Sequence, residues 1–239
     1  MTFNQLEFDI RCEWGENGVL QLAPISDVVV IVDVFSFSTC IDIATSRGAI
    51  IYPYRWRDET AVTFAASIGA ELADGKRTNS GYSLSPQSLT QIPKGTRLVL
   101  PSPNGSTLTL RTEKTPTLTG CLRNYQAVAF AAQKYGKRVA LIPAGERWKD
   151  GSLRPALEDW IGAGAIISQL RGNLSPEAGV ALAAFRNAQS AIERLLQQSS
   201  SGKELIERGF EKNIALASAL NVSECVPLFV DGAYIRTGA

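Results

Sequence analysis

The sequence predicts a three-layer α/β/α protein, in which helices cover both faces of a mostly parallel or mixed sheet. Two observations lead to this fold class. Mainly apolar runs, as at 28–32 and 138–143, are typical of strands buried on both faces. Segments with helix start and stop signals separate these runs, so strands and helices alternate along the chain. The length of 239 residues, 45% of them hydrophobic, suffices for a sizeable core.

The first hundred residues begin with alternating apolar and polar residues at 6–12, which predict a half-exposed strand. Strands are then expected at 28–34, 50–54 and 97–100, and helices at about 38–47, 58–68 and 86–89. Asp58 is placed to cap the second of these helices, and Gly48 and Gly69 to end the first two. The stretch 75–86, rich in Gly, Ser and Asn, is expected to be a long loop of the kind that often carries function.

The second half of the chain is expected to be mainly helical. Strands are predicted at 116–119 and 138–143, helices at 124–135, 155–170, 175–198, 203–208 and 211–219, and a closing hairpin at 227–230 and 233–236. Gly162 and Gly164 should allow the helix at 155–170 to pack closely against the sheet. Although 175–220 is almost purely helical, we expect residues 1–239 to form a single domain.

The composition narrows the functional class. Lys and Arg total 24 and Asp and Glu total 23, and this net charge of +1 argues against a general nucleic-acid binder. No apolar run approaches the roughly 20 residues that span a bilayer, and the N-terminus does not resemble a signal peptide. The four cysteines are scattered and form no CxxC pair, so reduced thiols and a cytoplasmic location are expected.

The chain contains no histidine. This absence excludes a Ser-His-Asp triad, a Cys-His dyad, a phosphohistidine intermediate and a His-ligated zinc site. Acid–base chemistry must then come from carboxylates, Lys, Tyr, Cys or water bound to a metal. A metal site would be built from oxygen ligands, which favours Mg²⁺ or Mn²⁺.

The segment VVVIVDVFSFSTC at 28–40 carries the strongest functional signal. It predicts a buried strand, a carboxylate at Asp33, a turn rich in hydroxyl groups and a helix. Ligands of open α/β sheets bind at the carboxyl ends of strands, where an acid can hold a metal or take part in chemistry. The alternative interpretation is that Asp33 caps the next helix and that Ser36, Ser38 and Thr39 satisfy turn amides.

Two more loops follow apolar strands. The loop PSPNGST at 101–107 offers Asn104, Gly105 and Ser106 as an anion cradle, although a plain Asn-Gly turn is the better explanation when the loop is taken alone. No Walker A or GxGxxG pattern accompanies it, so nucleotide binding lacks support. If the strands are parallel neighbours, these loops converge with the Asp33 loop at one edge of the sheet.

The third loop carries Glu146, and Glu158 and Asp159 lie near the start of the following helix. Helix-dipole stabilisation alone would explain acids in a first turn. Because adjacent helical residues point about 100° apart, Glu158 and Asp159 are unlikely partners on one ion, but one of them could join Asp33 and Glu146 in an all-oxygen Mg²⁺ site. The arginines considered for anion binding are Arg57, Arg123, Arg147 and Arg154.

Six segments spread over most of the chain occur together in one order. They are VVVIVDVFSFSTCIDIATSRGA at 28–49, GYSLSP at 81–86, LPSPNGS at 100–106, CLRN at 121–124, LEDWIGAGAII at 157–167 and VPLFVDG at 226–232. Together they resemble the 2-phosphosulfolactate phosphatase family. The resemblance implies a layered α/β/α fold and a Mg²⁺-dependent phosphatase. Its substrate would be a small phosphorylated organic acid, 2-phospho-3-sulfolactate, on the route to coenzyme M. The sequence departs from the family's motif at Ser36, where an arginine is common.

On this hypothesis Asp33, Glu146 and Asp159 are the catalytic acids, and Asp33, Glu158 and Asp159 are the candidate Mg²⁺ ligands. The expected phosphate-binding residues are Ser36, Ser38, Thr39, Asn104, Gly105, Ser106 and Arg123. Attack on phosphorus would come from water or, less favourably, from Asp33, because Phe35 breaks the DxD pattern of aspartyl-phosphate enzymes. The alternative function is a non-catalytic anion-binding or regulatory protein that retains the fold. Neither nucleic acid nor membrane is an expected partner, and a homodimer is left open.

Overall fold

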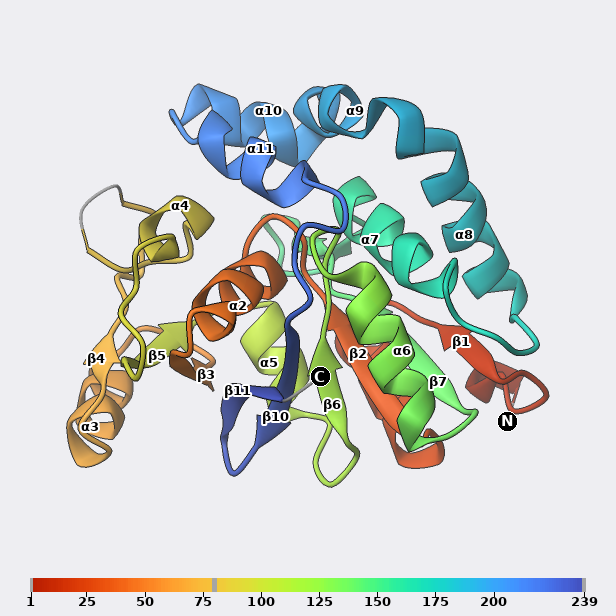
Figure 1. The fold of residues 1–239 in the computed structure, drawn as a ribbon, viewed down its shortest axis with the longest axis horizontal. Helices are drawn as coiled ribbons and strands as arrows, with labels where there is room; N and C mark the ends of the chain where they lie inside the picture. Colours follow the sequence, from red (N-terminus) through yellow and green to blue (C-terminus); the bar gives the residue numbers. More distant parts are fainter. Residues whose placement is uncertain (1, 79–80, 238–239) are drawn as a thin grey trace.

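The computed structural model describes residues 2–78 and 81–237, and within them nine strands form one mixed sheet between layers of helices (Figure 1). The predicted three-layer α/β/α class is therefore confirmed. From edge to edge the strands are β1 (Ile10–Cys12), β7 (Val139–Pro143), β2 (Val28–Val32), β6 (Thr117–Thr119), β10 (Val226–Val230), β11 (Ala233–Thr237), β3 (Ile50–Tyr54), β5 (Arg97–Pro101) and β4 (Glu71–Leu72).

The sheet consists of two parallel groups joined by a hairpin. Strands β1, β7, β2 and β6 run parallel to one another, as do β3, β5 and β4. The predicted hairpin β10–β11 lies between the groups and pairs antiparallel with β6 on one side and β3 on the other. Three successive antiparallel pairings reverse the strand direction, so the two groups run in opposite senses. The prediction that β2 and β5 could be parallel neighbours is therefore wrong, whereas β2 and β7 are.

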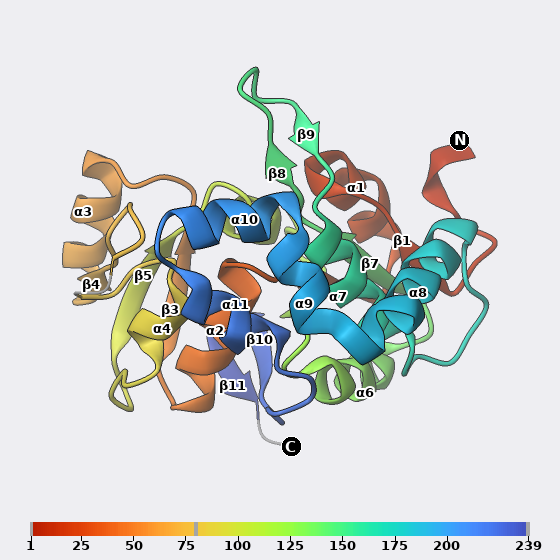
Figure 2. The same cartoon turned by 90° about the horizontal axis from the view of Figure 1, so that it is seen from above.

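Twist brings the two groups into a crossed arrangement. Strands β2 and β6 are seen side-on in Figure 1, whereas β3 and β5 are foreshortened there and appear at full length in Figure 2. Adjacent strands rotate by roughly 20–25°, so the five steps from β2 to β5 add about 100° or more. Strand ends that would lie at opposite edges of a flat sheet are thereby able to approach each other.

Helices cover both faces of β2, as its alternating side chains require. Val29 and Ile31 pack in a cluster with residues of α1 (Gly15–Leu22) and α5 (Gly105–Leu110). Val28, Val30 and Val32 face the other way and pack with α6 (Tyr125–Tyr135) and α7 (Leu157–Ile167). A third cluster joins α2 (Phe37–Ser46) and α4 (Pro86–Leu89) to β3, β5 and β11. Helix α3 (Glu59–Ser67) begins at the predicted cap Asp58, which accepts the Ala61 N–H at 3.1 Å.

The C-terminal helices form an arch above α7 and α2 in Figure 1, and α9, α10 and α11 lie over the middle of the molecule in Figure 2. They are α8 (Pro176–Ala188), α9 (Ile192–Gln198), α10 (Ser200–Glu207) and α11 (Glu211–Ser218). The single helix predicted over 175–198 is wrong, because a 3₁₀ turn at Gln189–Ala191 interrupts it. The interruption lets α8 pack on α7 while α9 packs on α11.

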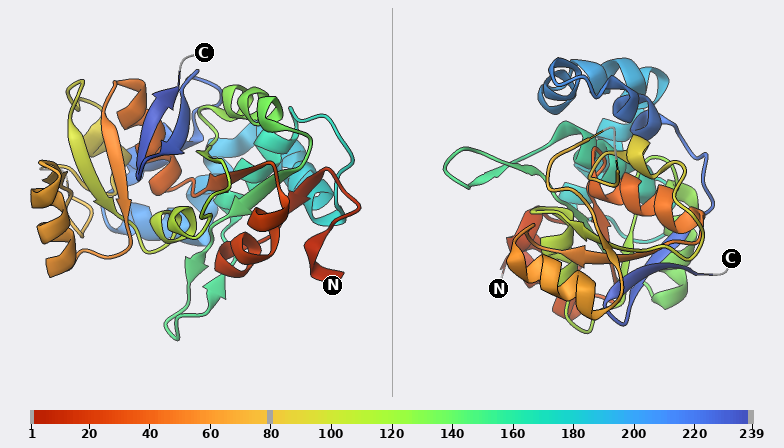
Figure 3. Two further views of the ribbon diagram at one scale, coloured as in Figure 1. Left: turned by 90° about the horizontal axis from the view of Figure 1, so that it is seen from below. Right: turned by 90° about the vertical axis from the view of Figure 1, so that its left-hand side faces the viewer.

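Two further details differ from the sequence-based expectation. The first strand covers Ile10–Cys12 alone and is fully buried rather than half-exposed, with Arg11 donating to the carbonyls of Phe8 and Ile25. A small hairpin of β8 (Glu146–Arg147) and β9 (Leu153–Arg154) was not predicted, and it projects from the body of the protein (Figure 3). Among the residues that the structure describes, no helix combines the length and apolar character needed to cross a bilayer.

The two glycines of α7 serve different contacts. A Cβ on Gly162 would lie 2.6 Å from the Val34 side chain and 2.9 Å from that of Val32, so this glycine does allow close packing against β2. A Cβ on Gly164 would instead lie 1.9 Å from the carbonyl oxygen of Ala181 in α8. The prediction of packing against the sheet is thus confirmed for Gly162 and wrong for Gly164, which permits the approach of α8.

We predict that Gly164→Ala destabilises the protein by about 1–3 kcal/mol, because the added methyl group meets the backbone of α8. Gly179→Ala is the matched control: Gly179 also lies inside a helix, and a Cβ there meets nothing within 4 Å. This control should be neutral or stabilising by up to about 1 kcal/mol through helix propensity. Urea unfolding of both variants checks the prediction, and equal stability of the two would contradict it.

Candidate active site

Asp33 joins the loop after β2 to the loop after β5. One oxygen of its buried carboxylate, Oδ1, accepts the Phe37 N–H at 3.2 Å and therefore caps α2. The other oxygen, Oδ2, accepts the Gly105 N–H at 3.1 Å, at the start of α5. The two chain segments approach so closely that a Cβ on Gly105 would lie 2.3 Å from the Phe37 ring. The capping interpretation of Asp33 is confirmed, and the same carboxylate also brings two loops together.

Asp159 makes the corresponding connection to the loop after β7. This buried carboxylate on the first turn of α7 accepts the Val34 N–H at 2.7 Å through Oδ1 and the Gly145 N–H at 2.9 Å through Oδ2. The three loops therefore meet, although the condition on which the prediction rested holds for only two of them. The loops after β2 and β7 follow neighbouring parallel strands, whereas the loop after β5 joins them through the Asp33 carboxylate.

Glu146 and Asn104 connect the second and third loops directly. The Asn104 side-chain amide donates to Glu146 Oε2 at 3.0 Å. A pocket of about 260 Å³ borders this pair, between α1 and the β8–β9 hairpin. Its other lining residues are Trp14, Gly15, Glu16, Asn17, Leu20, Leu108, Ala144, Arg147 and Leu153. Glu146 is thus an acid that a small molecule can reach.

Glu158 is directed away from the contacts made by its neighbour Asp159. Its side chain is almost completely buried, with 2% of the residue exposed. Glu158 Oε2 has no hydrogen-bond partner in the described part of the chain. The nearby charges are those of Glu146 and Arg154, and Arg154 also donates to Ser201 Oγ of α10 at 3.1 Å. A buried carboxylate oxygen without a partner is costly, so this position favours a proton or a cation.

Burial raises the pKa of all four acids. The pKa of Asp33 rises to about 7 because of burial first and the Glu146 charge second. Burial, then the charges of Asp33 and Glu158, hold the pKa of Asp159 well above its ordinary value. Burial also raises the pKa of Glu146 and of Glu158, and Glu146 adds to the shift of Glu158. Of the four acids Glu146 alone lines the pocket in the described part of the chain, and a cluster of acids with raised pKa values beside a pocket is typical of a catalytic or cation-binding site.

The acids fit Mg²⁺ as a pair rather than as a cage. Among residues 2–78 and 81–237, no group of three or more His, Cys, Asp or Glu side chains is arranged to hold a metal ion. The predicted ligands Asp33, Glu158 and Asp159 therefore do not form one preassembled cluster. Mg²⁺ in phosphoryl-transfer sites commonly uses one or two carboxylates together with water and substrate phosphate. Since each carboxylate oxygen has two lone pairs, Asp33 retains acceptor capacity beside its two N–H contacts.

The hydroxyl groups predicted to bind phosphate have internal partners. Ser38 Oγ contacts Thr119 Oγ1 at 2.7 Å and accepts the Asp33 N–H at 2.9 Å. Thr39 Oγ1 donates to the Val34 carbonyl at 2.7 Å, and Ser106 Oγ donates to the Leu100 carbonyl at 3.1 Å. These bonds hold the turns in shape, and the predicted phosphate contacts stay predictions.

Arg123 lies outside the loop cluster. Its guanidinium donates to Asp42 at 2.8 Å and to the Leu216 carbonyl at 3.0 Å, which connects α2 to α11. Of the other arginines considered, Arg57 pairs with Asp74 at 3.7 Å and Arg147 approaches Glu16 at 4.0 Å. Arg147 lines the same pocket as Glu146, and the charge of Arg154 lowers the pKa of Glu146 and of Glu158 against the effect of burial.

Sequence reasoning missed Arg77. It lies in the predicted long loop, of which residues 79–80 are outside the described part of the structure. Its Nη2 donates to the Phe35 carbonyl at 3.0 Å and to Ser36 Oγ, and its Nη1 donates to the Leu84 carbonyl. The one available signal was a basic residue within a Gly- and Ser-rich loop, and this signal does not indicate which loop the side chain will reach.

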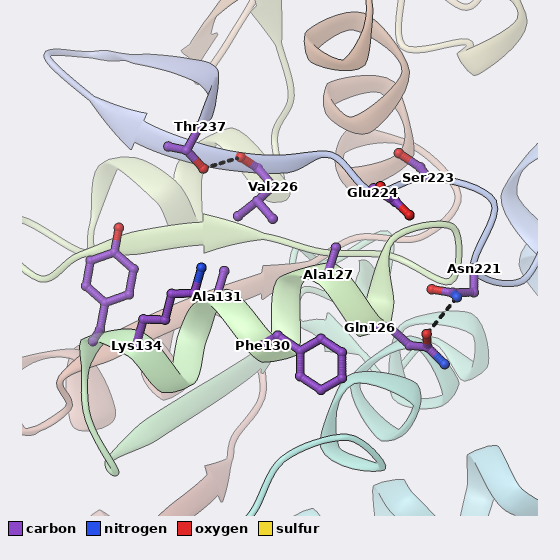
Figure 4. A pocket seen from close by; sticks show the side chains of 11 residues that line it. Gln126, Ala127, Phe130, Ala131, Lys134, Asn221, Ser223, Glu224, Val226 and Thr237 are labelled. Carbon is purple, nitrogen blue, oxygen red and sulfur yellow. Dashed lines mark hydrogen bonds between the residues drawn. The ribbon is translucent and has the colours of Figure 1, made fainter. Parts of the chain in front are cut away.

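A larger groove of about 480 Å³ lies elsewhere, between α6 and the segment that leads into β10 (Figure 4). Phe130 and Lys134 line it from the helix, and Gln126 accepts a hydrogen bond from Asn221 at 2.8 Å across one end. Glu224 is the one carboxylate among its lining residues, and it is exposed. The groove therefore lacks the clustered buried acids that mark the three-loop site.

Buried acids beside a pocket, where three strand-end loops meet, are typical of the catalytic or binding site of an α/β enzyme. The sequence matches the 2-phosphosulpholactate phosphatase family over residues 19–232, and the chain belongs to this family of phosphoric monoester hydrolases. It is 27% identical over 207 residues to a 2-phosphosulfolactate phosphatase of Methanothermobacter thermautotrophicus, covering 87% of this chain and 88% of the relative. It is 32% identical over 209 residues to a protein of Carboxydothermus hydrogenoformans named "Probable 2-phosphosulfolactate phosphatase", covering 83% and 84% of the two chains.

We predict that the metal-free protein becomes less stable as the pH rises from about 4 to about 7. Asp33 has an ordinary pKa of 3.8 and a pKa of about 7 in the fold, so the folded state binds more protons over this range. The contribution of Asp33 to stability is complete below its ordinary pKa of 3.8. It is lost as the pH rises past its pKa of about 7 in the folded protein. For one such group the free energy of unfolding falls by at most about 1.4 kcal/mol per pH unit.

Urea unfolding in EDTA at a series of pH values measures this slope. Asp33→Asn should flatten it, whereas Asp231→Asn, a change at an exposed turn, should leave it unaltered. A slope that is the same in the wild type and in Asp33→Asn would contradict the assignment of the raised pKa to Asp33.

Proposed function

We propose that the protein is a Mg²⁺-dependent phosphatase that hydrolyses the phosphate monoester of a small organic acid, with 2-phospho-3-sulfolactate as the expected substrate. The convergence of Asp33, Glu146 and Asp159 through three loops carries this proposal. The names of the relatives support the substrate, which would place the reaction in the cytoplasm on the route to coenzyme M. The proposal involves neither nucleic acid nor membrane.

Asp33 and Asp159 would hold the Mg²⁺ ion, which leaves Glu146 free for proton transfer. When bound, this ion supplies positive charge that offsets the charge developing on the transferred phosphoryl group. Asp159 also positions the site, because the two N–H groups that it accepts fix the loop after β2 relative to the loop after β7. The resulting rigid arrangement orients the phosphoryl group for in-line attack by water.

Glu146 is the best placed acid for proton transfer. It borders the pocket, its pKa is raised, and the Asn104 amide fixes the orientation of its carboxyl group. A protonated Glu146 donates its proton to the alkoxide oxygen that leaves phosphorus. The water route is preferred to a covalent phospho-Asp33, because Phe35 breaks the DxD pattern of aspartyl-phosphate enzymes.

We predict Mg²⁺-dependent hydrolysis of an aryl phosphate and of 2-phospho-3-sulfolactate by the purified protein, and loss of both activities in EDTA. Asp33→Asn should lower kcat/KM by at least about 10²-fold, since it removes a charge that the proposed site needs. Release of inorganic phosphate is the measurement, and Asp231→Asn is the control for removal of an exposed acid.

Thermal unfolding of each variant separates loss of chemistry from loss of fold. Full Mg²⁺-dependent activity in Asp33→Asn would overturn the proposed site. Phosphate binding by the wild type without turnover of either substrate would favour the non-catalytic anion-binding alternative.

A further inference from the structure

We infer that Arg77 binds the phosphoryl group of the substrate, an inference that rests on the proposed phosphatase function. The side chain reaches the site from the loop before α4 and ends beside the turn that follows Asp33. There it donates to the Phe35 carbonyl at 3.0 Å and to Ser36 Oγ, and it is fixed on its other side by the Leu84 carbonyl. These hydrogen bonds hold the guanidinium in one orientation. The two acceptors Phe35 and Ser36 follow Asp33 by two and three positions in the sequence.

The charge of Arg77 is not matched by a salt bridge. No carboxylate lies within 4 Å of its guanidinium among the residues that the structure describes, whereas Arg57, Arg123 and Arg147 each have an acidic partner. Asp33 and Glu146 are close enough to influence its pKa, which burial lowers and these charges raise. Arg77 is therefore a half-buried cation at the edge of the acid cluster.

The donors of Arg77 also leave room for a ligand. A guanidinium has five N–H groups, and the three hydrogen bonds to Leu84, Phe35 and Ser36 occupy three of them. Nε and one hydrogen of Nη1 have no acceptor in the described part of the chain. Each of these two N–H groups is available to donate to one oxygen of a phosphoryl group.

Part of the usual means of holding a phosphate is already engaged at this site. Phosphate commonly binds the free N–H groups at a helix N-terminus. Here the Phe37 N–H of α2 and the Gly105 N–H of α5 both donate to Asp33, and Ser38, Thr39 and Ser106 have internal partners. A dianionic phosphoryl group next to several carboxylates needs a cation from the protein as well as from the metal, and Arg77 is placed to supply it.

The test compares Arg77→Gln and Arg77→Lys with Lys76→Gln, a control that removes an exposed positive charge from the adjacent residue. The measurements are KM and kcat for hydrolysis, and the affinity for inorganic phosphate, by product inhibition and by calorimetry in the presence of Mg²⁺. Arg77→Gln should weaken phosphate binding and raise KM by about 10–100-fold. Arg77→Lys keeps the charge without the fork and should give a smaller loss, while Lys76→Gln stays within about twofold of the wild type.

Unchanged phosphate affinity and KM in a folded Arg77→Gln variant, with only a lower thermal midpoint, would overturn the inference and leave Arg77 a structural residue. If Arg77→Gln does not fold, phosphate affinity in Arg77→Lys decides in the same way. Failure of the proposed function gives a different result: the wild type then shows no turnover, while phosphate binding that depends on Arg77 still supports the inference.

Discussion

Two buried carboxylates hold the site together, and the other features of the site depend on them. Asp33 and Asp159 accept four backbone N–H groups, from Phe37, Gly105, Val34 and Gly145, which belong to the loops after β2, β5 and β7. Burying a carboxylate costs several kcal/mol, and hydrogen bonds to a charged acceptor offset part of that cost. Each carboxylate contacts two segments that are distant in sequence. Strand pairing also joins the loops after β2 and β7, whereas no strand pairing joins the loop after β2 to the loop after β5, so Asp33 is the main connection there.

The same buried carboxylates that fix the loops also place several negative charges close together. Burial and mutual repulsion raise the pKa values of the acids, and Glu158 has a buried oxygen that lacks a partner among the described residues. The folded protein therefore favours bound protons, a bound cation, or both at this point. A proposed Mg²⁺ ion and the guanidinium of Arg77 would neutralise part of the negative charge of the acids. The same positive charge would attract a phosphorylated substrate. The burial and mutual repulsion of these carboxylates therefore both destabilise the charged cluster and suit it to hold a cation for catalysis.

Local sequence signals identified Asp33, Glu146 and Asp159 because each follows a buried strand or begins a helix, and such positions are visible in the chain itself. The same signals gave the hairpin at Asp231 and the cap at Asp58. They could not give the strand order, since the insertion of β10–β11 between β6 and β3 depends on pairings between distant segments. They also could not show that α8 and α9 separate, or that Arg77 crosses to Ser36, because both follow from packing among remote elements.

The central claim is that each buried carboxylate holds its own pair of loops, and hydrogen exchange at the four accepted amides tests it most directly. Asp159→Ala should speed exchange at Val34 and Gly145, and Asp33→Ala at Phe37 and Gly105, each by about tenfold or more, given the cost of removing the charged acceptor from a buried N–H. The other pair in each variant should keep its protection. Unchanged exchange, or equal acceleration of all four amides in both variants, would contradict the account.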